Sequence, residues 1–303
     1  HRAAPVQYIR PEIIGLILGA YVLSMIRGEH QSKGGSSPII RFILGFFVMI
    51  GALMFLGCPI RMILRLGGGD LNALFGIAGF AGGIGFGTIF LKKGYSLQRT
   101  YALSKLESAM MPAIQVGLLV LVVTAPAFIF FSQKGPGAMH APWLISLAAG
   151  LVVGGLSQVS RLCTVGGFRD LFLFKKSVLI FGYLAVLVGV FVVNISFGNF
   201  HLGFENQPIA HTDGLWNFLG MALAGFCSVL LGGCPLRQLI MTGEGNSDSA
   251  VTVLGLAAGA AFAHNFGLAA SGAGPTLNGQ IAVGVGFVVA LIIAILNTKR
   301  ATA

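Results

Sequence analysis

The sequence predicts an all-α, polytopic helical membrane protein, and three observations support this fold class. Hydrophobic residues make up 55% of the 303 residues and charged residues only 9%, whereas about a quarter of the residues in a soluble domain are charged. Long apolar runs meet the requirement of about 20 residues for a membrane-spanning helix. The chain has 45 glycines, which favours closely packed helices over a β-barrel, whose strands alternate polar and apolar residues.

Nine spans are expected from the positions of these apolar runs. They cover residues 11–26, 41–57, 71–91, 111–131, 143–159, 177–197, 215–232, 250–270 and 280–297. Two Gly-Cys-Pro segments follow the second and the seventh span. They are too short and too broken by glycine and proline to cross a bilayer, so we expect re-entrant half-helices or capped turns there.

The distribution of basic residues predicts the orientation in the membrane. Loops 27–40, 92–110, 160–176 and 237–249 and the C-terminal tail fall on one side. With Arg41 at its edge, this side holds 14 of the 19 basic residues: Arg27, Lys33, Arg41, Lys92, Lys93, Arg99, Lys105, Arg161, Arg169, Lys175, Lys176, Arg237, Lys299 and Arg300. The other side holds Arg2, Arg10, Arg61, Arg65 and Lys134. The positive-inside rule makes the first side, with the C-terminus, cytoplasmic. It also accounts for the net charge of +10 without a nucleic-acid partner.

An internal repeat dominates the sequence. The pentapeptide Gly-Cys-Pro-x-Arg occurs as Gly57-Cys58-Pro59-Ile60-Arg61 and as Gly233-Cys234-Pro235-Leu236-Arg237, separated by 234 − 58 = 176 residues. An odd number of predicted spans lies between the copies, so they face opposite sides of the membrane. This pattern is typical of inverted-repeat transporters. We therefore expect about five-plus-five spans, with residues 1–135 as the first repeat and 136–303 as the second.

A third motif has no partner in the first half of the chain. The segment Ser160-Arg161-Leu162-Cys163-Thr164-Val165-Gly166-Gly167-Phe168-Arg169-Asp170 places its cysteine 234 − 163 = 71 residues before Cys234. The equivalent position before Cys58 precedes residue 1, and span 143–159 has no mate either. The chain starts with His1, and residues 1–10 lack a signal-peptide pattern. We therefore expect the natural protein to begin at least one helix earlier.

The two Gly-Cys-Pro-x-Arg copies predict sites for a soft anion. Proline at the first helical position leaves Cys58 and Cys234 at a helix N-cap, where the positive end of the helix dipole faces the thiol. Arg61 and Arg237 follow three residues later and add positive charge. The alternative is a close helix contact with an apolar cysteine and an arginine that reaches the headgroups. Two copies with the same offset favour the anion site.

The third motif adds another thiol between two arginines. Cys163 lies between Arg161 and Arg169, and Asp170 is available to neutralise one of them. Cytoplasmic topology alone explains the arginines. It does not explain the cysteine or the glycines at 166 and 167, which permit tight backbone geometry near a ligand. We therefore include this segment in the predicted site.

The other polar and glycine-rich features receive structural interpretations. Cys227 lies in the middle of a span and is expected to be buried as a small apolar residue, whereas His264 and Asn265 are weaker candidates for the pathway. The run Gly82–Gly87 indicates close helix packing, and segments 67–70 and 243–246 are expected to form turns after the half-helices. The four cysteines form no C-x-x-C pair, and we find no metal-ligand set, catalytic triad or cofactor motif.

The three cysteine motifs together resemble the YeeE/YedE membrane family with its sulphur-transport domains, and its selenium-associated YedE branch most closely. The resemblance implies an inverted-repeat membrane protein in which short broken helices bring cysteines to a central path. YeeE members take up thiosulfate through such cysteines, and by motif this role transfers to Cys58, Cys163 and Cys234. The YedE branch is associated with selenium metabolism as a candidate selenium transporter.

The sequence thus predicts a non-enzymatic transporter or channel in the bacterial inner membrane for a small sulfur or selenium anion. Cys58, Cys163 and Cys234 would bind the anion. The arginines Arg61, Arg161, Arg169 and Arg237 would supply positive potential or brace the half-helices, and Gly57, Pro59, Gly233 and Pro235 would shape the breaks. Expected partners are membrane lipid and a cytoplasmic sulfur or selenium carrier protein. The alternatives are a membrane thiol oxidoreductase, or persulfide relay, and a purely structural membrane subunit.

Overall fold

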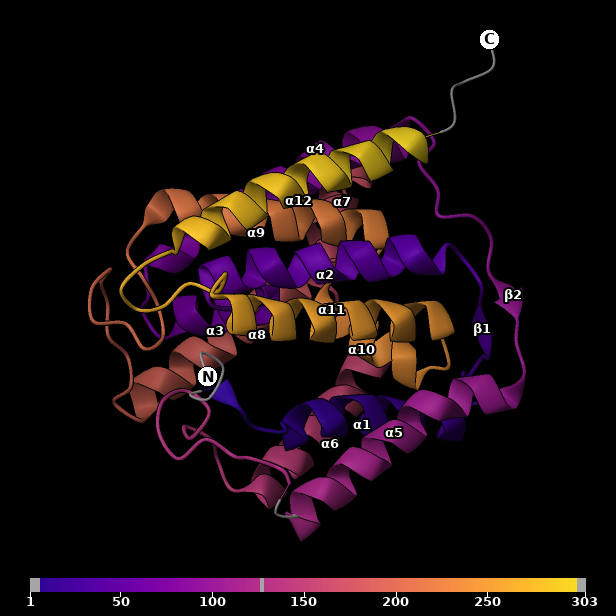
Figure 1. Ribbon diagram of the computed structural model, residues 1–303, viewed down its shortest axis with the longest axis horizontal. Helices are drawn as coiled ribbons and strands as arrows, with labels where there is room; N and C mark the ends of the chain where they lie inside the picture. Colours follow the sequence, from indigo (N-terminus) through magenta and orange to yellow (C-terminus); the bar gives the residue numbers. More distant parts are fainter. Residues whose placement is uncertain (1–5, 126–127, 299–303) are drawn as a thin grey trace. The chain divides into compact units, whose positions relative to one another are not determined.

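The computed structural model describes residues 6–125 and 128–298 and is built almost entirely from helices (Figure 1). Within these residues, eight helical segments are long and apolar enough to cross a membrane, and Pro11–Ile26 is a shorter apolar helix. The protein is therefore an all-α, multi-pass membrane protein, as predicted. Arg2, Lys299, Arg300 and the predicted cytoplasmic C-terminus lie outside the described residues.

The helices follow one another along the chain, joined by connections of very different lengths. They are α1 (Pro11–Ile26), α2 (Pro38–Phe55), α3 (Pro59–Gly67), α4 (Asn72–Lys92), α5 (Lys105–Thr124), α6 (Trp143–Ser160), α7 (Thr164–Phe174), α8 (Val178–Ser196), α9 (Gly214–Leu231), α10 (Pro235–Gly243), α11 (Ser247–Phe266) and α12 (Leu277–Leu296). Two short strands, β1 (Lys33–Gly34) and β2 (Tyr101–Ala102), pair antiparallel with Lys33 opposite Ala102. A helix occupies each of the nine predicted spans.

The span predicted at 111–131 needs correction because α5 begins six residues earlier, at Lys105. The Ser104 hydroxyl caps the helix by accepting a hydrogen bond from the Glu107 backbone N–H at 3.4 Å. The helix then continues through Pro112 and ends at Thr124. The predicted span also included residues 126–127, which lie outside the described residues.

Residues 160–176 were predicted as a loop, and this prediction is wrong because they contain α7. Arg161 adopts a left-handed conformation that ends α6, and the Cys163 sulfur caps α7 by accepting from the Gly166 N–H at 3.2 Å. A Cβ added to Gly167 would lie 3.3 Å from the Ile180 backbone nitrogen. The paired glycines thus let α7 approach α8 closely, which is a packing role.

The chain divides into two compact units, and each combines segments from both halves of the sequence. Unit 1 comprises the described parts of His1–Arg41, Gln98–Leu162 and Arg237–Val253. Unit 2 comprises Phe42–Leu97, Cys163–Leu236 and the described part of Leu254–Ala303. The predicted division into repeats at about residue 135 concerns the sequence halves, and it stays a prediction.

Unit 1 is held together by close backbone contact between α1 and α6. A Cβ on Gly19 would fall 2.2 Å from the Leu151 carbonyl oxygen, and one on Gly150 would fall 2.4 Å from that of Glu12. Helix α5 also packs on α1. Without a hydrophobic driving force between helices in lipid, such small-residue contacts supply much of the packing energy.

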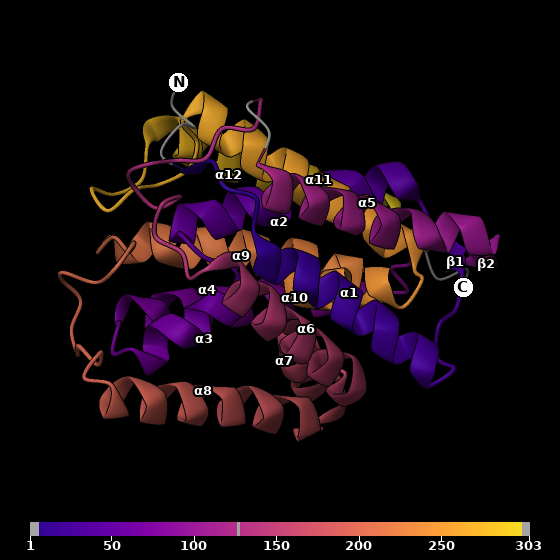
Figure 2. The ribbon, with the colours of Figure 1, turned by 90° about the horizontal axis from the view of Figure 1, so that it is seen from below.

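Unit 2 is organised around α9, which packs against α4, α7 and α12. A glycine stripe on α4 makes the closest contact, because a Cβ on Gly79 or Gly83 would lie 2.0 Å from the carbonyl oxygen of Phe218 or Ala222. The glycine run therefore serves helix packing, as predicted. Within an apolar stretch of 18 residues in Gly214–Gly243, 89% of the residues are buried, whereas only 6% are buried in the corresponding stretch of α8, which runs past α3 and α7 (Figure 2).

The two copies of the repeat share one order of elements. Helices α2, α3 and α4 have 18, 9 and 21 residues, and α9, α10 and α11 have 18, 9 and 20. Each short helix begins at the predicted proline and leaves through the predicted turn. Gly69 and Gly245 occupy equivalent positions with φ of +99° and +96°, which glycine adopts without strain. The opposite orientation of the copies stays a prediction.

Candidate functional site

Three of the four cysteines mark the starts of short helices. Cys58 is the N-cap of α3 and is followed by proline at the first helical position, and Cys163 is the N-cap of α7. Cys234 directly precedes Pro235, the first residue of α10. Proline suits this position because the missing N–H would have no partner within the helix. Each thiol therefore lies at the positive end of a helix dipole.

These three cysteines lie close together in unit 2 and are called the thiol centre below. Cys163 and Cys234 are close neighbours, and both the thiol and the backbone N–H of Cys234 lie within reach of the Cys163 sulfur. Cys58 lies within electrostatic range of Cys234, and the N–H groups of Ile60 and Arg61 face its sulfur. The fold thus brings together three residues that are separated by 105 (163 − 58) and 71 (234 − 163) positions in the sequence.

The thiols differ in accessibility. Cys234 is 1% exposed and Cys163 is 6% exposed, whereas Cys58 is half-buried. A buried helix N-terminus favours an anion, because the backbone N–H groups and the helix dipole act there with little screening by water. Cys58 is the thiol that an incoming ligand can reach most easily.

Tyr183 also belongs to this site, although no motif in the sequence marks it. Its hydroxyl donates a hydrogen bond to the Pro59 carbonyl oxygen at 3.2 Å, and its ring contacts that of Phe168 edge-on, with centroids 6.1 Å apart. It also lies within electrostatic range of Cys58 and Cys234. Tyr183 is one of several aromatic residues in the apolar helix α8. The fold shows that it is the one buried residue of this helix.

Arg61 lies beside Cys58, as the repeat predicted. The two residues interact electrostatically, and the aliphatic part of Arg61 packs on the backbone of Gly57. A Cβ at Gly57 would lie 2.9 Å from the Arg61 Cδ. The glycine of the motif therefore leaves room for the arginine three helix positions beyond the cysteine.

Arg169 forms an ion pair with its neighbour Asp170, with an N···O distance of 2.8 Å. Asp170 therefore neutralises one of the two arginines that flank Cys163, as expected. Both side chains are partly exposed, so this pair contributes little to stability.

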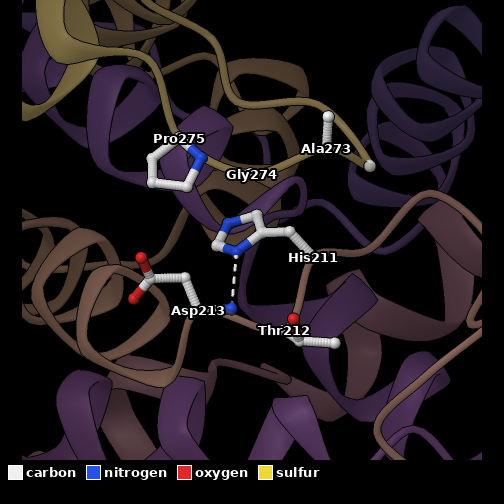
Figure 3. Close-up of a pocket in the computed structure, with 7 residues that line it drawn as sticks. His211, Thr212, Asp213, Ala273, Gly274 and Pro275 are labelled. Carbon is white, nitrogen blue, oxygen red and sulfur yellow. Dashed lines mark hydrogen bonds between the residues drawn. The ribbon is translucent and has the colours of Figure 1, made fainter.

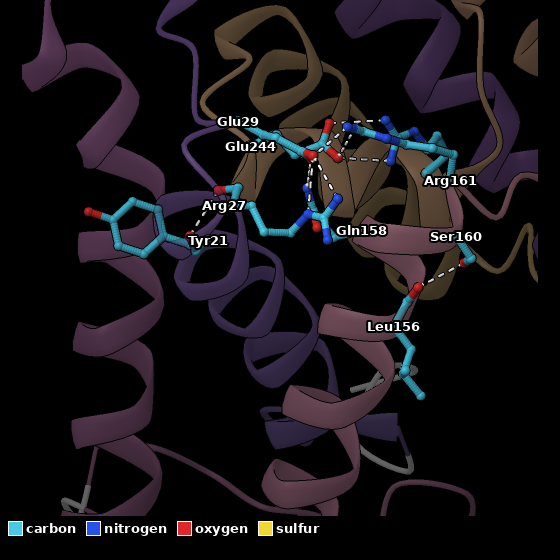
Figure 4. Close-up of polar contacts among 10 residues, drawn as sticks. Tyr21, Arg27, Glu29, Leu156, Gln158, Ser160, Arg161 and Glu244 are labelled. Carbon is cyan, nitrogen blue, oxygen red and sulfur yellow. Dashed lines mark hydrogen bonds and ion pairs between the residues drawn. The ribbon is translucent and has the colours of Figure 1, made fainter.

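Arg161 and Arg237 belong to unit 1, where they share the carboxylate of Glu244. Figure 4 shows Arg161 beside Glu244 and Glu29. The N···O distances to Glu244 are 2.7 Å for Arg161 and 3.0 Å for Arg237. Arg161 also pairs with Glu29 at 2.7 Å, and Gln158 donates to the same carboxylate at 2.6 Å. This network borders a pocket of about 320 Å³ that Gly28, Gln31 and Lys33 help to line.

The charge of these two arginines is therefore already matched by carboxylates. The hydrogen bonds from Gln158 and Arg27 lower the pKa of Glu29, so this carboxylate stays ionised. Glu244 pairs with Arg161, two positions before Cys163, and with Arg237, three positions after Cys234. The geometry fits bracing of the chain next to both cysteines better than direct anion binding.

Arg65 and Asp70 form a buried ion pair that the sequence analysis missed. The Arg65 Nε lies 2.6 Å from Asp70 Oδ2, and its Nη1 donates to the Phe55 carbonyl oxygen at 2.5 Å. The guanidinium carbon lies 4.0 Å from the centre of the Phe55 ring. One side chain thereby ties the end of α2 to the turn after α3, on both sides of the break at Cys58.

Unit 2 contains another pocket, of about 240 Å³. It is lined by the loop before α9 and by Gly272, Ala273, Gly274 and Pro275 (Figure 3). The ring of His211 accepts from the Asp213 N–H through Nδ1 at 3.3 Å and contacts the Met54 carbonyl oxygen through Nε2 at 2.8 Å. This arrangement assigns the proton to Nε2. Burial lowers the pKa of His211 below its ordinary value.

The remaining polar candidates lie as follows. Cys227 is fully buried, which confirms its expected burial in the span. Asn265 donates to the Ala261 carbonyl oxygen of its own helix at 2.8 Å, and His264 is half-buried; their role in the pathway stays a prediction. Among residues 6–125 and 128–298, no group of three or more His, Cys, Asp or Glu side chains is placed to hold a metal ion.

Comparisons with known proteins add an independent observation. No curated protein matches the chain significantly. A family model does match, over a segment that contains α7 to α12 with Cys163 and Cys234. The match covers 300 − 159 + 1 = 142 of the 303 residues, and it supports a sulfur-related transport function. Residues 159–300 of this membrane protein are thus similar to the family described as sulphur transport.

Proposed function

We propose that this protein is a transporter or channel that moves a small sulfur- or selenium-containing anion inward across the bacterial inner membrane. The observation that carries the proposal is the thiol centre, in which three cysteines gather at the N-termini of three short helices. The sulphur-transport match over residues 159–300 agrees with it. Thiosulfate and selenium compounds are the candidate substrates.

In this proposal the anion passes along the thiols without covalent chemistry. The half-buried Cys58 receives it, and the more deeply buried Cys234 and Cys163 hand it on toward the cytoplasm. Thiols are weak hydrogen-bond donors. The backbone N–H groups at the helix starts and the charge of Arg61 therefore provide most of the affinity.

The other arginines act by positioning the cysteine segments. Arg161 and Arg237 hold the chain next to Cys163 and Cys234 through their shared carboxylate, and Arg169 is neutralised by Asp170. Pro59 and Pro235 start the short helices, and Gly57 and Gly233 precede the cysteines. A cytoplasmic carrier protein is the proposed acceptor of the anion, and lipid surrounds the spans.

The contact between Cys163 and Cys234 favours a second candidate, a membrane thiol oxidoreductase. In that case the two thiols would lose two protons and two electrons to form a disulfide, with a soluble thiol–disulfide protein as the redox partner. The rest of the site gives this reaction no further support. Counting free thiols in protein held under oxidising and reducing conditions tests for such a cycle.

Uptake into proteoliposomes tests the transport proposal directly. Purified wild-type protein and the variants Cys58→Ala, Cys234→Ala and Cys227→Ala are compared with radiolabelled thiosulfate and labelled selenium compounds. We expect uptake of one substrate by the wild type, its loss in the first two variants, and its retention in Cys227→Ala, whose thiol lies outside the thiol centre. Uptake that survives both Cys58→Ala and Cys234→Ala would rule out transfer along the thiols.

A further inference from the structure

Helix α8 contributes one buried residue, and that residue carries a hydroxyl. All other positions of Val178–Ser196 are exposed or half-buried, whereas Tyr183 is 4% exposed. Its hydroxyl reaches the first turn of α3, next to Cys58. Phenylalanine would pack against Phe168 as well as tyrosine does. The hydroxyl in this apolar surrounding therefore calls for a function of its own.

A second buried hydroxyl belongs to the residue that follows another cysteine of the thiol centre in the sequence. Thr164 directly follows Cys163 and is 1% exposed. Its Oγ1 is buried and has no hydrogen-bond partner among the residues that the structure describes. A buried hydroxyl without a hydrogen-bond partner is costly. Thr164 therefore adds an independent indication that an oxygen-bearing group binds next to the thiols.

We propose that Tyr183 and Thr164 recognise the oxygens of the transported anion, so that the thiol centre selects an oxygen-bearing sulfur or selenium anion over one without oxygen. This inference rests on the proposed function. The thiols match a soft sulfur or selenium atom, whereas hydroxyl groups form short hydrogen bonds with a charged oxygen. When the anion binds, the Tyr183 hydroxyl gives up its hydrogen bond to the Pro59 carbonyl oxygen and donates to the anion instead, because a charged acceptor forms the stronger hydrogen bond.

A purely structural role predicts a different result. If Tyr183 only ties α8 to α3, its loss weakens binding of every anion to a similar extent. A role in recognition affects the oxygen-bearing anion alone. The comparison of two anions therefore separates the two roles.

Equilibrium binding to the purified full chain in detergent provides the test. Labelled thiosulfate is displaced by unlabelled thiosulfate or by thiocyanate, which has a soft sulfur and no oxygen. The variants are Tyr183→Phe and Thr164→Val. The matched controls are Tyr21→Phe on α1 and Thr88→Val on α4, whose hydroxyl is already bonded to the Gly85 carbonyl oxygen. Thermal unfolding of each variant checks that it is folded.

We expect each of the two site variants to weaken thiosulfate binding about tenfold or more, with thiocyanate binding changed less than about twofold and both controls unchanged. Equal loss for both anions, or no loss for thiosulfate, overturns the inference and leaves the proposed function intact. A wild-type protein that binds neither anion overturns both.

Discussion

At the scale of single residues, the two copies of the repeat stabilise their short helices with different ion pairs. Arg65 and Asp70 lie 176 positions before Met241 and Asn246, so the second copy lacks the buried pair of the first. The second copy uses Arg237 and Glu244 instead. Gly68, the counterpart of Glu244, carries no charge. Each copy thus stabilises its short helix with one ion pair, but the two ion pairs use different positions of the repeat.

Replacing Arg65 by methionine, the residue of the second copy, is expected to destabilise the protein by about 3–5 kcal/mol, because Asp70 is then buried without its partner. The double variant Arg65→Met/Asp70→Asn removes both charges and should regain much of this loss. Thermal or denaturant unfolding in detergent measures both effects. If the double variant is less stable than Arg65→Met, desolvation of Asp70 is not the cause.

At the scale of elements, the α4–α9 contact depends on two glycines without room for a side chain. Gly83→Ala places a Cβ 2.0 Å from the Ala222 carbonyl oxygen, and overpacking of this kind costs about 1–3 kcal/mol. Gly82 is the matched control, since its nearest neighbour would lie 3.9 Å away. We expect a lower melting temperature for Gly83→Ala and an unchanged or higher one for Gly82→Ala. Similar shifts in both variants would show that helix propensity governs the effect.

The loop before α9 should make stability depend on pH. His211 has a folded-state pKa below its ordinary value of 6.5 because it is buried, so its contribution is present above that value and is lost as the pH falls. Protonation also removes the acceptor for the Asp213 N–H. We expect the melting temperature to fall between about pH 7 and pH 5. In His211→Gln, whose amide keeps a donor for the Met54 carbonyl oxygen, the melting temperature should fall less over this pH range. A pH profile identical to that of the wild type would show that other groups cause the fall.

The sequence predicted the elements well where one signal was strong. Apolar length located the spans, and proline located the starts of α3 and α10. It failed at α7, because a short helix rich in glycine looks like a loop until Cys163 is seen to cap it. It also missed Tyr183, Thr164 and the Arg65–Asp70 pair. These depend on which side of a helix is buried and on residues far away in the chain, which periodicity in an all-apolar helix does not reveal.

At the scale of the whole molecule, the distribution of charge predicts a C-terminus in the cytoplasm. Single cysteines introduced at Lys134 and Lys176 of a variant without native cysteines test this orientation, since both side chains are exposed. In intact spheroplasts, a membrane-impermeant maleimide should label Lys134→Cys, whereas Lys176→Cys should need permeabilised membranes. The reverse pattern would invert the topology, and with it the proposed direction of entry from Cys58.

Segments of unit 1 lie between segments of unit 2 along the sequence, so helices that pack together in unit 2 are synthesised at different times. Helix α4 ends at Lys92 and its partner α9 begins at Gly214, so 214 − 92 = 122 residues must be synthesised before the glycine stripe can be covered. At about 5–20 residues per second this takes roughly 6–24 s. During biogenesis, newly inserted α4 therefore presents Gly79 and Gly83 to lipid and to other nascent helices. Insertion chaperones that shield such small-residue surfaces would protect α4 until α9 is made.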